Sequence, residues 1–294
     1  GYYNKNGSCE IGGKVYNNIQ TNNGAVLIND TCKVADIGLE IYVNKTNANN
    51  SVPGLEISKG ATFECNYNLI SWNNVIKGSI SSDAGLGISN AGTFKMNGGT
   101  LAVYGNYASY YGISTGVQFG SKKDSSTTIS NTRFEFGRET TTDDAVAPTG
   151  ILASGDINIL NATGYVRALG AAFIRPANNV SGAVVISGEN DSHLRLESVR
   201  GLNSVVSNLG KDDALNGLNI SYCDIYSEAD ICYSGIENYA KLTISGCKID
   251  GRKQKFDLAT KEFSKINDET LGLLNGVVTY GATIFEKNSD TESI

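Results

Sequence analysis

The chain has 294 residues, among them 34 Gly, 3 Pro and 6 Cys, and its formal net charge is −6. Lys and Arg are scattered through this acidic chain, so it shows no basic footprint for nucleic acid. No apolar run approaches the roughly 18 residues that a membrane helix requires, which argues against membrane insertion of this fragment. The number of cysteines favours an oxidising compartment, with the protein secreted or at the cell surface.

A short unit recurs along most of the chain. Its clearest copy is residues 235–251, GIENYAKLTISGCKIDG, where an alternating strand is followed by a Ser-Gly corner and a second strand. With Ile244 as the anchor, the equivalent positions are Ile28, Cys65, Met96, Ile129, Ile159, Ile186 and Ile220. The spacings run from 24 residues (220 to 244) to 37 residues (28 to 65), and Asn or Ser follows every anchor except Ile159. Internal repeats of this length are typical of solenoids.

The pattern within each unit has a physical explanation. Apolar and polar residues alternate, as in residues 133–136 (RFEF), which predicts strands with one buried face. Strands of three to five residues cannot bury that face alone, whereas stacked coils share one continuous core. Asn and Ser tolerate turn geometry at the corners, and we expect their side chains to hydrogen-bond along the stack.

Coils with this length and corner pattern resemble the right-handed parallel β-helix of the pectate-lyase-like superfold. Residues 235–251 and 92–105 (GTFKMNGGTLAVYG) are similar to repeats of bacterial cell-surface proteins of that shape, some of them carbohydrate-binding. The resemblance covers roughly residues 20–251. It implies an all-β, single-domain right-handed parallel β-helix (solenoid) of about eight or nine coils. A two-sheet sandwich is the alternative, and it predicts longer strands with turns about every 8 to 12 residues.

In chain order, residues 1–24 lack the repeat and are predicted to cap the N-terminal end of the stack, and residues 25–251 form the β-helix. Cys9 and Cys32 are placed to pin the cap to the first coil. Residues 252–294 break the pattern and predict a hairpin around residues 258–260, a last coil at 276–285 and a tail.

Cysteines also mark the C-terminal coils. Cys223 and Cys247 each follow their anchor by three residues, so they are expected on neighbouring strands about 4.8 Å apart. They are either buried thiols or a disulfide, and Cys232 is a further partner for one of them.

Aromatic residues give the best candidates for ligand binding, because sugar rings stack on aromatic rings while Asn, Asp and Arg bond to the hydroxyls. These candidates are Trp72, Tyr104, Tyr107, Tyr110 and Tyr111. The other interpretation of each is an aromatic that packs in a rung or loop, since residues 101–111 also alternate in polarity.

Catalytic candidates are weaker. Asp143, Asp144 and Arg138 lie in a polar protrusion, residues 137–149, that fits either a solvated loop or the acid groups of a glycoside hydrolase or lyase. Apart from the Asp143-Asp144 pair, the motifs of β-helical polygalacturonases are missing, and the single histidine, His193, is predicted to be a surface residue beside Asp191. No spacing indicates a metal site, although lyases of this fold use calcium, which remains the one cofactor to consider.

The sequence therefore favours a non-enzymatic secreted or cell-surface β-solenoid module used in adhesion or glycan binding, with a polysaccharide or host glycan as partner. The alternative is a carbohydrate-active enzyme, a polysaccharide lyase or glycoside hydrolase, on a β-helix scaffold. A flat face of Tyr and Asn would favour binding, whereas carboxylates clustered with Arg on one face would favour catalysis.

Overall fold

The computed structural model describes fifteen segments of the chain. They are residues 2–17, 25–45, 53–75, 86–105, 111–115, 125–137, 149–176, 184–199, 204–210, 217–228, 234–253, 256–257, 262–263, 275–279 and 283–286. Their regular structure consists of β-strands alone.

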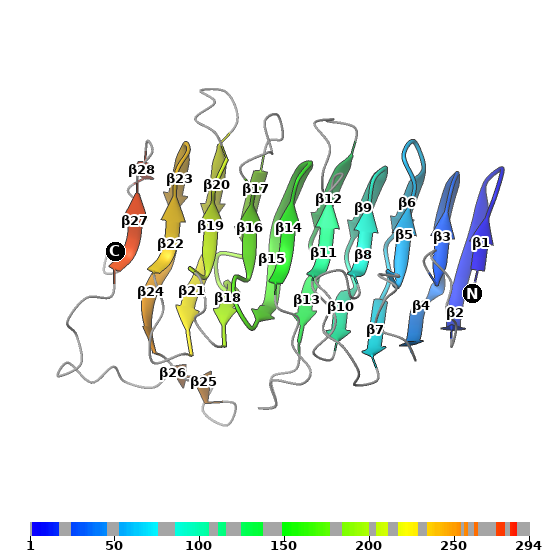
Figure 1. Cartoon of the computed structure of the whole chain (residues 1–294), viewed down its shortest axis with the longest axis horizontal. Helices are drawn as coiled ribbons and strands as arrows, with labels where there is room; N and C mark the ends of the chain where they lie inside the picture. The colour runs from blue at the N-terminus through cyan, green and yellow to red at the C-terminus, as the bar shows by residue number, and fades with distance from the viewer. Residues whose placement is uncertain are drawn as a thin grey trace.

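The first sheet contains ten parallel strands, and each turn of the chain contributes one of them (Figure 1). In stacking order they are β1 (Tyr2–Asn4), β3 (Val26–Ile28), β5 (Leu55–Ile57), β8 (Leu86–Asn90), β11 (Tyr111–Thr115), β14 (Thr149–Ala153), β16 (Phe173–Arg175), β19 (Val206–Asn208), β22 (Ser234–Asn238) and β27 (Asn275–Thr279).

The second sheet contains sixteen strands, because most turns place two further strands in it, on either side of a corner. These strands are β2 (Cys9–Asn17), β4 (Thr31–Lys45), β6 (Thr62–Cys65), β7 (Leu69–Val75), β9 (Thr93–Asn97), β10 (Thr100–Gly105), β12 (Ser126–Ser130), β13 (Arg133–Phe136), β15 (Asp156–Ala168), β17 (Val184–Gly188), β18 (Leu194–Ser198), β20 (Leu218–Ser221), β21 (Cys223–Ser227), β23 (Leu242–Ser245), β24 (Lys248–Lys253) and β28 (Thr283–Glu286). The long strand β4 spans the corner, since its first part pairs with β6 and its second part with β7.

Every pairing within these two sheets is parallel, and successive turns lie side by side from the blue N-terminal end to the red C-terminal end of Figure 1. The all-β parallel solenoid predicted from the repeat is therefore confirmed, and the sandwich is excluded. The number of coils differs from the predicted eight or nine, because the first sheet alone has ten strands in stacking order.

The predicted anchor residues form the core of the second sheet. Seven of the eight lie in one inward-facing row: Cys65, Met96, Ile129, Ile159, Ile186, Ile220 and Ile244. All seven are buried. The eighth, Ile28, was assigned wrongly, since it lies in β3 of the first sheet; because Lys33 pairs with Glu64, Val34 is the residue opposite Cys65. The error arose because an apolar residue followed by Asn is found at the end of β3 in the first sheet as well as before the corner of the second sheet.

Polar side chains connect successive turns at the corner of the second sheet. Asn131 donates its side-chain amide to Asn97 Oδ1 at 2.8 Å, and Asn161 donates to Asn131 Oδ1 at 2.8 Å. Further along the stack, Ser221 Oγ donates to Ser187 Oγ at 3.0 Å. The predicted hydrogen bonding along the stack is confirmed. Asn131 and Asn161 also adopt positive φ angles, 52° and 53°, which Asn tolerates better than most residues.

We expect Asn131→Ala to lower the free energy of unfolding by about 1–2 kcal/mol, because Ala is strained at positive φ and loses both amide hydrogen bonds. Asn131→Gly is the matched control, since it removes the same side chain and relieves the backbone. Urea denaturation of the two variants separates the cost of backbone strain from the cost of the lost hydrogen bonds. Equal losses in both would show that backbone strain contributes nothing at this corner.

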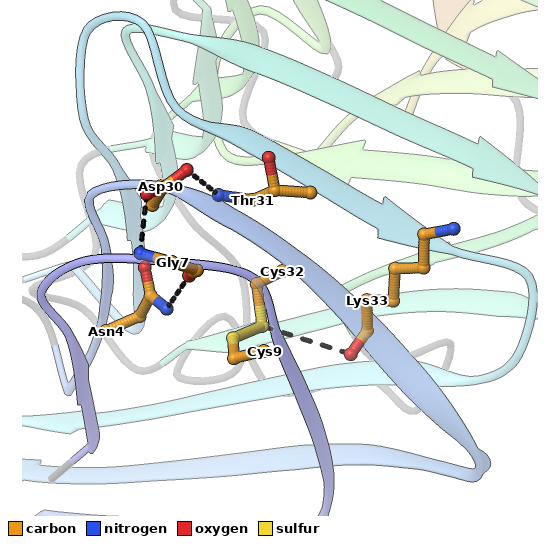
Figure 2. Close-up of a disulfide and its surroundings, with 7 residues drawn as sticks. All are labelled: Asn4, Gly7, Cys9, Asp30, Thr31, Cys32 and Lys33. Carbon is orange, nitrogen blue, oxygen red and sulfur yellow. Dashed lines mark hydrogen bonds between the residues drawn. A yellow bond between two sulfur atoms is a disulfide. The ribbon is translucent and has the colours of Figure 1, made fainter.

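A disulfide between Cys9 and Cys32 joins the first turn to the second (Figure 2). Beside it, the Asp30 carboxylate accepts hydrogen bonds from the backbone amides of Gly7 at 2.6 Å and Thr31 at 2.8 Å. Residues 1–24, predicted to be a cap, contribute β1 and β2, which lie at the end of the stack and pair in parallel with β3 and β4.

Cys223 and Cys247 lie on neighbouring strand positions, since Asp224 pairs with Lys248. Both are buried free thiols, which is one of the two predicted states, and burial raises the pKa of Cys223. Cys232 lies outside the described residues.

Near the C-terminus, β25 (Phe256–Asp257) and β26 (Glu262–Phe263) pair antiparallel on either side of the predicted hairpin turn.

Candidate ligand-binding face

Four aromatic side chains occupy the same outward position on successive turns. Tyr16 in β2 pairs with Tyr42 in β4, Tyr42 with Trp72 in β7, and Trp72 with Tyr104 in β10. They alternate along their strands with buried residues such as Ile41. Their side chains therefore point outward, on the face of the sheet that is turned away from the core. We call these four residues the aromatic row.

The rings of the row stack along the solenoid axis. Tyr16 and Tyr42 have centroids 4.8 Å apart with planes at 11°, and Tyr42 and Trp72 are 6.3 Å apart at 4°. Because 6.3 Å exceeds the spacing of about 4.8 Å between strands, Trp72 is displaced sideways and overlaps Tyr42 only in part. Trp72 and Tyr104 are tilted by 39° at 4.3 Å. Offset and tilt leave part of the ring surface uncovered, and Tyr16 is 57% exposed at the end of the row.

Charged groups fix the polar edge of the row. Tyr42 Oη donates to Glu40 Oε2 at 2.5 Å, and Lys14 Nζ lies 3.5 Å from the same carboxylate. The hydrogen bond to Glu40 raises the pKa of Tyr42 to about 12.

The other end of the row repeats this arrangement. Tyr104 Oη donates to Glu135 Oε2 at 2.8 Å, and Arg133 Nε donates to Glu135 Oε1 at 2.7 Å. Apolar ring surface beside fixed donors and acceptors suits a ligand with both apolar faces and hydroxyl groups.

Two of the five predicted ligand-binding residues, Trp72 and Tyr104, are thus brought together. Tyr111 lies in β11 of the first sheet rather than beside Tyr104. Tyr107 and Tyr110 lie outside the described residues.

The sequence reasoning missed Tyr16 and Tyr42. One signal was available, because an aromatic followed within two residues by Asn recurs at 16–17 (YN), 42–44 (YVN), 72–73 (WN) and 104–106 (YGN). The recurring residue lies in the strand after the corner, whereas the anchors of the repeat lie before it.

The catalytic candidates Arg138, Asp143 and Asp144 lie outside the described residues. Among the residues that are described, no group of three or more His, Cys, Asp or Glu is arranged to hold a metal ion. His193, predicted to lie beside Asp191, instead contacts Asp224, with its Nδ1 2.7 Å from Asp224 Oδ1.

A buried ionic cluster lies further along the outer side of the second sheet. Arg167 in β15 pairs with Glu197 in β18, and Glu197 with Tyr226 in β21. Arg167 Nε is 3.0 Å from Glu197 Oε1 and its Nη2 is 2.7 Å from Glu228 Oε2, while Tyr226 Oη donates to Glu197 Oε2 at 3.0 Å. The side chains of Arg167 and Glu197 are only 5% and 4% exposed.

Burial, and then the hydrogen-bonded Glu228 carboxyl, raise the pKa of Glu197 to about 8. Glycosidases place their two carboxyl groups at least about 5 Å apart with room for substrate or water between them. Both oxygens of the buried Glu197 carboxyl are already bonded, to Arg167 and to Tyr226, while the Glu228 side chain is 21% exposed. The cluster is suited to holding three neighbouring turns together.

No family model, curated protein or solved structure matches this chain. Within the described segments, no helix is long and apolar enough to cross a membrane.

Proposed function

We propose that this protein is a non-enzymatic β-solenoid module, secreted or at a cell surface, that binds a glycan along the aromatic row and serves adhesion. The observation that carries the proposal is the in-register stack of four partly exposed aromatics beside Glu40, Lys14, Glu135 and Arg133. A linear polysaccharide lying along the solenoid axis meets a ring at each turn, about 4.8 Å apart.

Recognition follows from the two kinds of surface. The apolar faces of sugar rings pack against the uncovered parts of Trp72, Tyr104 and Tyr16. Sugar hydroxyls donate to the Glu40 and Glu135 carboxylates and accept from Lys14 and Arg133. The rigid sheet holds these groups in place before the ligand arrives, which reduces the entropic cost of binding.

We expect Trp72→Ala to weaken binding to the best ligand in a panel of soluble plant and host polysaccharides by about tenfold. Affinity gel electrophoresis measures the loss. Tyr239→Ala is the matched control, since Tyr239 is also an exposed aromatic but lies beyond β22 of the first sheet. Equal retardation of the wild type and Trp72→Ala on every retarding polysaccharide would contradict the proposal, as would a panel that retards neither.

The alternative, a carbohydrate-active enzyme, is tested with the same panel. Assays for reducing ends and for unsaturated products, with and without calcium, should remain at background. Product from any polysaccharide would overturn the non-enzymatic proposal, and Asp143→Asn would then be the first variant to examine.

A further inference from the structure

A separate hollow of about 670 Å³ opens on the N-terminal turns, within the usual size range of small-ligand sites. It lies on the strand segments before the corner and on the corner itself, whereas the aromatic row lies on the segments after it. Its walls include Glu10, Lys33, Asp36, Glu64, Asn66 and Tyr67. The hollow therefore constitutes a second surface, distinct from the proposed glycan face.

One wall of the hollow is aromatic. Tyr67 projects from the corner with 41% of its surface exposed, and it takes no part in the stack of the aromatic row. Asn66 is exposed beside it, and the buried side chain of Val34 lies in the same lining. A single ring with an apolar face fits against Tyr67, while the Asn66 amide is available to its polar substituents.

The carboxylates around the hollow differ in whether a lysine lies close enough to neutralise them. The Glu64 carboxylate is neutralised by Lys33 Nζ at 3.6 Å and by Lys95 Nζ at 3.4 Å. Glu10 and Asp36 are exposed, and neither side chain has a hydrogen bond or ion pair with the described residues. Two exposed carboxylates facing one hollow favour a ligand that carries a positive charge.

The hollow has a rigid frame. Cys9 belongs to its lining and is bonded to Cys32, the residue before Lys33, which ties β2 to β4 (Figure 2). The hydrogen bonds of Asp30 to Gly7 and Thr31 fix the same corner of the first two turns. Glu10 and Lys33 are register partners, so the two sides of the site are held at the spacing of adjacent strands.

We propose that this hollow binds an amino sugar, a hexose ring that carries a free ammonium group. The ring packs on Tyr67, its hydroxyls bond to Asn66 and Lys33, and its ammonium group is held by Glu10 and Asp36. The site does not depend on the aromatic row, because the two share no residue.

The test uses isothermal titration calorimetry with a tetramer of β-1,4-linked glucosamine and its fully N-acetylated counterpart. The two probes have the same backbone, and only the first carries amines. We expect the glucosamine tetramer to bind at least about tenfold more tightly than the acetylated one. The difference should shrink as salt is raised from about 0.05 to 0.5 M, because exposed charges are screened.

Three variants locate the site. The double variant Glu10→Gln with Asp36→Asn keeps the shape of the wall and removes its charge, and we expect about a tenfold loss for the glucosamine tetramer. Tyr67→Ala should cause a similar loss, whereas Trp72→Ala should leave this affinity unchanged.

Either of two results overturns the proposal: equal affinity of the two probes, including no binding of either, or unchanged affinity of the double variant. A loss with Trp72→Ala alone would assign the amino sugar to the aromatic row instead. Failure of the polysaccharide panel together with success here would refute only the proposed glycan face.

Discussion

Arg167→Ala is expected to lower the free energy of unfolding by about 3–5 kcal/mol, because it leaves the half-buried Glu228 carboxylate without its cation and the buried Glu197 carboxyl without a hydrogen-bond donor. Arg167 bonds to both Glu197 and Glu228 and so connects β15, β18 and the end of β21. Urea denaturation at pH 7, followed by circular dichroism, measures the change.

The matched control is Arg133→Ala. Arg133 also pairs with a glutamate, Glu135, at 2.7 Å, but its side chain is 54% exposed. A pair of this kind contributes at most about 1 kcal/mol, since water solvates both partners after the pair is broken. If the two variants lost the same free energy, the cluster around Arg167 would not be a buried support of the solenoid.

A second large effect concerns pH. The pKa of Glu197 is raised to about 8 in the folded protein, while an unfolded glutamate titrates near about 4.3. Between these values the folded state keeps a proton that the unfolded state has released. The contribution of Glu197 to the free energy of unfolding is therefore largest below about pH 4.3, falls as pH rises towards 8 and then levels off. We expect a contribution on the order of 5 kcal/mol across this window.

The main cause of the raised Glu197 pKa is burial, to which the neighbouring charges add. Glu228 faces Glu197 and disfavours its ionisation, whereas Arg167 and Arg195 favour it, and burial is the largest effect. Tyr226 donates to Glu197, and burial raises its own pKa well above the usual value. Tyr165 in β15 packs under the Arg195 guanidinium, 5.3 Å from the ring centroid.

Glu197→Gln tests the assignment, because the amide resembles the protonated acid and cannot titrate. Thermal or urea unfolding between pH 5 and pH 9 should show a shallower decline for this variant than for the wild type. Glu237→Gln, in β22 of the first sheet, should leave the wild-type decline in place. A parallel decline in all three proteins would place the titrating group elsewhere.

The two proposed sites and the buried cluster divide the outer side of the second sheet among different tasks. The aromatic row and the hollow both lie on the N-terminal turns, where partly exposed rings and exposed carboxylates face solvent. The buried Arg167 cluster lies on later turns. Both proposed sites thus lie on turns that precede the buried cluster in the stack.

The sequence by itself determined the parallel stack, because the alternation of polarity and the recurring Asn and Ser corners are local. It placed seven anchors correctly and failed only at Ile28, where two kinds of corner share one pattern. The sequence also identified Trp72 and Tyr104 as candidate ligand-binding residues.

Only the tertiary structure decided which residues of different turns share an outward position. The strand register places Tyr16 and Tyr42 in line with Trp72. Neither tyrosine lies in the aromatic-rich segment 101–111 from which most of the candidates were predicted. Likewise, Arg167, Glu197 and Glu228 resemble ordinary surface charges in the sequence, and their burial follows from packing across three turns. Spacing along the chain sets the period of a solenoid, but loop lengths vary from turn to turn, so lateral neighbours are fixed only when the turns stack.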